Sequence, residues 1–293
     1  MTPLQVTRDN LQSIVQQLIE HHLDRPDSSP FQTAAQSLTH NIASSTSDGV
    51  GPTLAQLSSY RLVLVQRLLV ICSHDTYDNV VDFQWYLSVL LDLTYVAFVK
   101  VGEQIRDQLV DIVARVRGVK RWAVELMTRL IRDDTFLANS QEEGRCAEVL
   151  WAAAWICGEN SRWCISFVSA PSHHNNLRNS EIAEPQKLLP YLLQSNVSLL
   201  SSETIGIYIQ AAVKLFGAWS MELSQNWDNG KIQDVREVVN MLISRLKCFT
   251  SHHDAEVQER VRRIGAFFKY HSMEYRCFRL PTQYNCSISF API

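Results

Sequence analysis

Cysteine near histidine is the first combination in this chain that could carry chemistry. Cys157 lies in the stretch EVLWAAAWICGEN (148–160), and His173 and His174 follow in a polar segment. A cysteine nucleophile needs a nearby base and surroundings that favour the thiolate. Cys157 falls instead at the C-terminal end of a predicted apolar helix, where the helix dipole disfavours an anion. We therefore expect a structural cysteine, and we rank a thiol-dependent hydrolase last among the functions considered.

Metal binding is the second chemistry that the residue types could support. Histidines are adjacent at 21–22, 173–174 and 252–253, but neighbours on a helix point about 100° apart and do not readily bind one ion. The seven cysteines are scattered, with no CxxC or Cys/His spacing. We expect no metal, no other cofactor and no disulfide. Cysteines within apolar helical patterns are expected to act as small hydrophobic side chains: Cys72, Cys146, Cys157 and Cys248.

Anion binding by a basic cluster is the third chemistry that the residue types could support. The stretch ARVRGVKRW (114–122) surrounds a predicted helix-to-helix turn, and its cations are Arg115, Arg117, Lys120 and Arg121. Cations near a helix C-terminus are favourable in themselves, so a solvated helix end is one explanation. The other is a candidate contact for anionic lipid headgroups or an acidic partner. A second, weaker candidate consists of Arg260, Arg262, Arg263 and Lys269.

The overall composition excludes several function classes. Lys plus Arg number 27 against 30 for Asp plus Glu, so no net positive field would attract nucleic acid. The chain has no glycine-rich phosphate loop and no recognisable catalytic motif, which does not favour an enzyme or a small-molecule substrate. We find no secretory signal and no apolar run of the ~20 residues that span a bilayer, so we expect a cytoplasmic protein.

Helical periodicity dominates the rest of the sequence. Residues 1–23 predict a first amphipathic helix, 24–56 a flexible loop or linker, 57–270 a continuous helical region and 271–293 an irregular tail. A polar excursion from Ser169 to Gln186 interrupts the helices. Strand alternation is missing, apart from a weak hint in the last twenty residues. The predicted fold class is all-α.

The spacing of the predicted helices indicates a HEAT/armadillo-like α-solenoid. Consecutive helices recur at about 20 residues and helix pairs at about 35–45, and their apolar stripes are too broad for one partner. We expect Gly158 to end its helix in a left-handed conformation and Trp155→Ala to cost about 3–5 kcal/mol. The expected core residues are Trp85, Trp122, Trp151, Trp155, Ile156, Phe216 and Leu242.

Several stretches resemble the delta subunits of adaptor protein complex 3, which are large adaptins. EVLWAAAWICGEN is similar to a segment of that family, although the family generally has Tyr at the position of Trp151 and Phe at that of Asn160. The other similar stretches occur in the same order: DFQWYLSVLLDLT (82–94), LVDIVARVRGVKRWAVELM (109–127), AAVKLF (211–216) and AEVQER (255–260). The resemblance covers the C-terminal part of the trunk domain, whereas residues 271–293 resemble nothing in the family.

The resemblance implies a non-enzymatic scaffold in a vesicle coat. Its expected partners are the beta, medium and small subunits of the same complex, together with an ARF-family GTPase. It also implies peripheral membrane association and sorting from Golgi or endosomes to the lysosome or vacuole. The N-terminal trunk, which holds most cargo contacts in related adaptins, is expected to be missing, as are the hinge and the ear. The alternative function is a free-standing HEAT-repeat interaction regulator.

Overall fold

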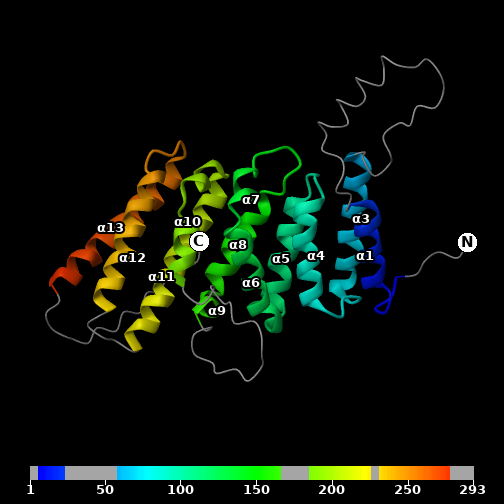
Figure 1. Ribbon diagram of the computed structural model, residues 1–293, viewed down its shortest axis with the longest axis horizontal. Helices are drawn as coiled ribbons and strands as arrows, with labels where there is room; N and C mark the ends of the chain where they lie inside the picture. The colour runs from blue at the N-terminus through cyan, green and yellow to red at the C-terminus, as the bar shows by residue number, and fades with distance from the viewer. Residues whose placement is uncertain (1–5, 24–57, 166–184, 226–230, 278–293) are drawn as a thin grey trace, which may run out of the picture.

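The structure, a computed structural model, describes residues 6–23, 58–165, 185–225 and 231–277 (Figure 1). The α-helices of these ranges are α1 (Leu11–His22), α3 (Ser58–Tyr77), α4 (Phe83–Val96), α5 (Gly102–Arg115), α6 (Lys120–Ile131), α7 (Asp134–Ala138), α8 (Glu148–Glu159), α9 (Ser161–Ile165), α10 (Pro185–Leu192), α11 (Ser202–Gln225), α12 (Lys231–Leu246) and α13 (Ala255–Cys277). Short 3-10 helices cover Arg117–Val119, Ser195–Leu199 and Lys247–Phe249. These ranges contain no strand, and the all-α expectation is confirmed.

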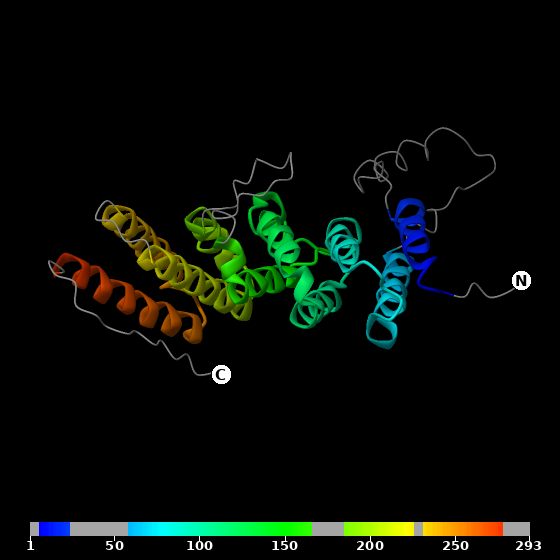
Figure 2. The ribbon, with the colours of Figure 1, turned by 90° about the horizontal axis from the view of Figure 1, so that it is seen from below.

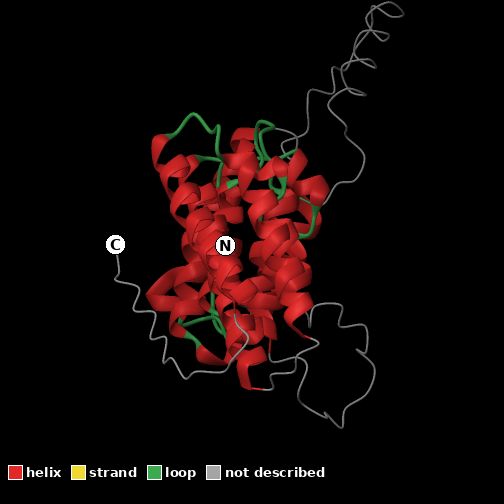
Figure 3. Cartoon of the chain, turned by 90° about the vertical axis from the view of Figure 1, so that its left-hand side faces the viewer, coloured by secondary structure: helices red, strands yellow, loops and turns green. Residues whose placement is uncertain are grey.

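The long helices form two layers that run side by side along the molecule (Figures 1, 2 and 3). Antiparallel pairs form between α1 and α3, α4 and α5, α6 and α8, α10 and α11, and α12 and α13. Each pair then contacts the next: the contacts run from α4 to α6 to α10 to α12 in one layer, and from α3 to α5 to α8 to α11 to α13 in the other. This arrangement confirms the predicted α-solenoid.

Aspartate side chains set the starts of three helices. Asp82 accepts hydrogen bonds from the backbone N–H groups of Gln84 and Trp85 at 2.8 and 3.2 Å, which caps α4. Asp133 caps α7 in the same way. Asp254 caps α13, where its carboxylate accepts from the backbone N–H groups of Glu256 and Val257 at 2.7 and 3.4 Å.

One hydrophobic core extends through the described helices. Helix α4 is apolar on nearly all sides, and α5 and α6 both cover it. Its side chains with no exposed surface are Tyr86, Leu87, Leu90 and Leu93. Arg61 of α3 donates to the backbone carbonyls of Val96 and Ala97 at the C-terminal end of α4. That contact joins two helix pairs through orphan carbonyls of a helix end, and the sequence pattern had not indicated it.

Some boundaries differ from the sequence-based expectations. Helix α13 continues to Cys277, so helix extends past residue 270, where an irregular tail was expected. Short helices α7 and α9 were not expected at all. The expected loop at 24–56, most of the Ser169–Gln186 excursion and residues 278–293 lie outside the described ranges. Within the described ranges no helix combines the length and hydropathy needed to cross a bilayer.

Candidate interaction surfaces

Helices α8 and α11 pack against each other near the middle of the solenoid, and Gly158 allows their backbones to approach closely. A Cβ atom added at Gly158 would lie 3.0 Å from the Cα and 3.1 Å from the Cβ of Ala211. The expectation of a left-handed cap was wrong, because Gly158 lies inside the helix and the cap residue is Asn160, with φ of −110°. The glycine is needed for the approach of two backbones. Lys214 and Glu159 form an ion pair across the same interface.

Trp151 and Trp155 lie on the edge of α8, not within the core. Their rings stack with centroids 6.4 Å apart and planes 10° from parallel, and both keep part of their surface exposed. The Arg106 guanidinium of α5 lies over the Trp151 ring at 5.7 Å. Trp151, Arg106 and Glu203 of α11 border a groove of about 400 Å³. The groove is lined further by Asp107, Val110, Asp111 and Ala114.

The expected core residues fall into two groups. Ile156, Phe216 and Leu242 are buried, with exposed fractions of 0, 9 and 0%. The tryptophans are half-buried and pack against the outside of the core: Trp85, Trp122, Trp151 and Trp155. The indole N–H groups of Trp122 and Trp151 have no hydrogen-bond partner among the described residues. Both indole rings therefore make apolar contacts with the core, while their N–H groups donate no hydrogen bond to the described residues.

For Trp155→Ala we expect a smaller loss of unfolding free energy than the sequence suggested, because the Trp155 ring is only half-buried. Truncation removes contact area but leaves no closed cavity, so the free energy of unfolding should fall by about 2 kcal/mol, below the full-burial range. Urea denaturation followed by circular dichroism measures this change. Ile156→Ala is the comparison, since Ile156 has no exposed surface on the same helix and should cost more. Equal losses for the two variants would contradict the half-buried placement.

Cys157 is buried in α8 beside the Thr128 hydroxyl and Cys164. It is 1% exposed, and its sulfur lies 3.7 Å from the Thr128 hydroxyl oxygen. The Cys164 thiol donates to the Cys157 carbonyl, and its hydrogen bonding with Cys157 and its burial raise the pKa of Cys164 well above the ordinary value. Burial likewise raises the pKa of Cys146 to about 11. His173 and His174 lie outside the described residues.

The other cysteine and histidine expectations have mixed outcomes. Cys72 and Cys146 are buried, but Cys248 is exposed in a 3-10 turn, so its placement in an apolar pattern was wrong. His252 and His253 have ring centroids 4.1 Å apart, yet the His252 Nδ1 accepts from the Asp254 N–H and serves the turn before α13. The part of the chain that the structure describes has no group of three metal-ligating side chains.

The basic cluster of Arg115, Arg117, Lys120 and Arg121 surrounds the tight turn between α5 and α6. Arg115 donates to the Asp111 carboxylate at 2.6 Å, an i,i+4 ion pair on α5. Arg117 is exposed in the 3-10 turn, and Lys120 and Arg121 begin α6. The four cations therefore lie along one turn, and Asp111 neutralises Arg115 locally.

The weaker basic candidate on α13 is mostly neutralised by its own helix. Arg260 pairs with Glu256, and Arg262 and Arg263 both pair with Glu259. Exposed i,i+3 and i,i+4 pairs of this kind stabilise a helix only slightly. The paired charges along α13 thus stabilise that helix.

Comparison with known proteins identifies the family. The model of the Adaptin N terminal region matches residues 5–272 of this chain. The chain is 32% identical to AP-3 complex subunit delta-1 of Bos taurus over 237 residues, which are 81% of this chain and 18% of that protein. It is 27% identical to AP-3 complex subunit delta of Dictyostelium discoideum over 233 residues, covering 73% and 19% of the two chains. The chain thus spans about a fifth of the length of these relatives.

A structural comparison supports the fold independently. The chain superposes on a structure described as a homology model of the full-length AP-3 complex in an intermediate open conformation, with a TM-score of 0.61. The match has 22% sequence identity and covers 93% of this chain and 41% of the other. At that identity the likeness establishes the α-solenoid. Since the family model matches all but the two ends of the chain, the protein belongs to the Adaptin N terminal region family.

Proposed function

We propose that this chain acts as a non-enzymatic scaffold within the delta subunit of adaptor protein complex 3. The similarity to delta subunits from animals and amoebae carries the proposal, supported by a two-layer solenoid that presents long helical faces. Such faces can hold the beta, medium and small subunits so that their binding sites are presented together. The complex would work in vesicle-mediated protein sorting from Golgi or endosomes to the lysosome or vacuole, recruited from the cytoplasm by an ARF-family GTPase.

Copurification of partner subunits tests this proposal. The full chain, tagged and expressed in cells, should recover the beta, medium and small subunits of adaptor protein complex 3 in stable proportions. Arg236→Gln, which removes a charge at an exposed position of α12, is a control that should leave recovery unchanged. Recovery of a kinase, a phosphatase or a transport factor without any adaptin subunit would instead favour the free-standing HEAT-repeat regulator.

We also propose that the basic cluster at the α5–α6 turn contacts anionic lipid when the complex lies on a membrane. Arg117 and Lys120 carry most of this contact, because Arg115 is paired with Asp111. Each Lys or Arg near an anionic surface contributes about 1 kcal/mol, so Arg117→Gln with Lys120→Gln should weaken binding about tenfold or more. Flotation with vesicles containing phosphatidylserine measures the loss, and Arg262→Gln with Arg263→Gln, which neutralises paired cations on α13, is the matched control.

A further inference from the structure

The groove of about 400 Å³ beside Trp151 follows one face of α5. Its apolar lining on α5 consists of Val110 and Ala114, which are four residues apart and so lie on the same side of the helix. The α5 lining begins at Arg106, so this face covers about 12 Å of helix. Ala114 is exposed, and Val110 and Trp151 are half-buried. The groove therefore offers an accessible apolar strip.

Carboxylates outnumber cations along this strip. Three acids line the groove: Asp107, Asp111 and Glu203. Arg106 is the one cation of the described lining, and it donates to a single oxygen of Asp107 at 2.9 Å. Asp111 pairs with Arg115. Glu203 is exposed on α11 and forms no ion pair among the described residues, so negative charge remains at this edge of the groove.

The Arg106 guanidinium is held by the negative charge around it. Burial lowers the pKa of Arg106, but the hydrogen bond and the charge of Asp107 outweigh burial and raise this pKa above its ordinary value. Glu103 and Glu203 act in the same direction. The guanidinium also lies over the Trp151 ring at 5.7 Å. One engaged cation among these carboxylates leaves a net negative groove, which attracts cationic groups of a partner.

Helix stabilisation explains only part of this charge. Glu103 and Glu203 lie in the first turns of α5 and α11, where the helix dipole favours an acid. Asp107 lies beyond the first turn and four residues after Glu103, and like charges at that spacing destabilise a helix. The Asp107 side chain is 67% exposed although it pairs with Arg106. A cation of a partner at Asp107 would offset the repulsion between the two acids.

The arrangement of the groove favours a helix over a small cation. A metal ion needs several oxygens that converge, and the described residues contain no group of three metal-ligating side chains. Asp107 and Glu203 come from different helices, and an apolar strip accompanies them. An amphipathic helix matches both features, because its apolar residues recur every three or four positions and its basic residues can flank them.

We propose that this groove binds a basic amphipathic helix of a partner protein. The apolar side chains of the bound helix contact Val110, Ala114 and the Trp151 ring, and its Lys or Arg side chains pair with Asp107 and Glu203. The site goes beyond the proposed scaffold role. Its test with a purified chain and a peptide gives a result whether or not adaptin subunits copurify with the chain.

Fluorescence anisotropy with the full chain tests the proposal. The probe is a fluorescein-labelled, alanine-based peptide that carries Leu and Lys in adjoining rows at four-residue spacing. In one comparison peptide Gln replaces Lys, and in another a central Pro interrupts the helix. The Lys peptide should bind, and its binding should weaken as salt rises. The Gln and Pro peptides should bind at least about tenfold more weakly.

Substitution of the two accessible carboxylates locates the binding site. An exposed ion pair contributes up to about fivefold in Kd, so Glu203→Gln should weaken binding of the Lys peptide about threefold. Asp107→Asn combined with Glu203→Gln should weaken it about tenfold. Asp111 is kept unchanged because its loss would free Arg115 and alter the charge of the basic cluster at the α5–α6 turn.

Asp234→Asn is the matched control. Asp234 is exposed in the first turn of α12, as Glu203 is in the first turn of α11, so both substitutions remove a similar interaction with a helix dipole. This control should change Kd by less than about twofold. Circular dichroism checks that each variant is folded, and Glu203→Gln alone keeps the test valid if the Asp107 variant does not fold.

Four results would overturn the proposal. They are unaltered binding by the folded groove variants, an equal loss in Asp234→Asn, equal binding of the Gln or Pro peptide, and no binding of the Lys peptide.

Sedimentation of the chain without peptide separates a partner protein from a second copy of this chain, whose basic cluster would also supply cations. We expect the same monomeric sedimentation coefficient for the unaltered chain and for Asp107→Asn with Glu203→Gln. A dimer that dissociates in this double variant would mean that a second copy occupies the groove, and the partner proposal would be wrong.

Discussion

Gly158→Val is expected to lower the free energy of unfolding by about 3 kcal/mol. The first added carbon would meet the Ala211 backbone at 3.0 Å, and the two further methyl groups would require α8 and α11 to move apart. Backbone atoms cannot rotate aside as a flexible side chain can, so the whole helix contact would be strained. Because α8 also packs on α5 and α6, the strain would spread to both layers.

Urea denaturation of the full chain measures this effect, and a second glycine provides the control. Gly217 lies inside α11, and a Cβ added there meets nothing within 4 Å. Gly217→Ala should therefore stabilise the protein by about 0.5–1 kcal/mol, since alanine favours a helix over glycine. Gly158→Ala should destabilise it, because the close contact outweighs the same gain. If both alanine variants were stabilising, the tight α8–α11 contact would be refuted.

The contrast between these glycines marks one limit of sequence reasoning. A glycine near the predicted end of a helix usually marks a left-handed cap, and Gly158 followed that pattern. Glycine is equally suited to a close approach of two helices, and only the position of Ala211, far along the chain, distinguishes the two roles. The left-handed glycine of the described chain is Gly144, with φ of 83°, against the carbonyl of Phe98.

The fold class could be predicted because its signal is local and repeated. Apolar residues at helical spacing recur through α5, α6, α12 and α13, and the regular spacing of helix pairs indicates stacking. The Asp254 cap was likewise predictable, because the bonding N–H groups lie two and three residues away. Helical periodicity predicts which face of a helix is buried, but not how deeply each side chain is buried. The tryptophans that we assigned to the core therefore lie at its edge.

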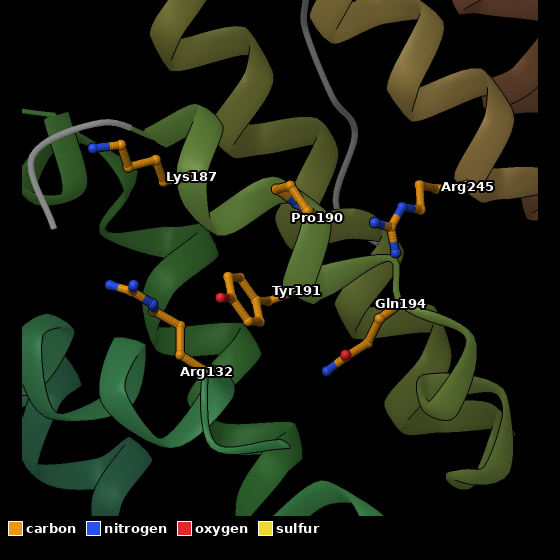
Figure 4. Close-up of a pocket in the computed structure, with 6 residues that line it drawn as sticks. All are labelled: Arg132, Lys187, Pro190, Tyr191, Gln194 and Arg245. Carbon is orange, nitrogen blue, oxygen red and sulfur yellow. The ribbon is translucent and has the colours of Figure 1, made fainter. Parts of the chain in front are cut away.

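The interaction surfaces were predictable only where their residues are close in sequence. The basic cluster at the α5–α6 turn is a short stretch and was identified as a candidate, although the Arg115–Asp111 pair reduces its charge. The 570 Å³ pocket where α6, α10 and α12 meet was not predicted, because its lining residues Arg132, Tyr191 and Arg245 are brought together only by the stacking of three helix pairs (Figure 4). Cys248 shows the converse limit, since an apolar neighbourhood in sequence did not ensure burial.

Phe268→Ala is expected to release α13 from the solenoid while most other helices stay folded. Phe268 is 1% exposed, and its ring meets that of Phe216 on α11 edge to face, with centroids 5.1 Å apart. Val257 and Val261 lie on the same buried face of α13. Removing a buried phenylalanine costs about 3–5 kcal/mol, and in a solenoid that loss falls on the contacts between neighbouring helices.

Hydrogen exchange resolves this local effect where a global unfolding curve would not. Amides of α13 should exchange about a hundredfold faster or more in Phe268→Ala, because each 1.4 kcal/mol lost from local opening is about a factor of ten. Amides of α4 and α5 should be unaffected. The control is Phe267→Ala, which removes the adjacent ring, 40% exposed, and should change exchange in α13 far less. Equal acceleration in α4 and α13 would mean that the helices unfold as one cooperative unit, against the nearest-neighbour stacking on which the scaffold role depends.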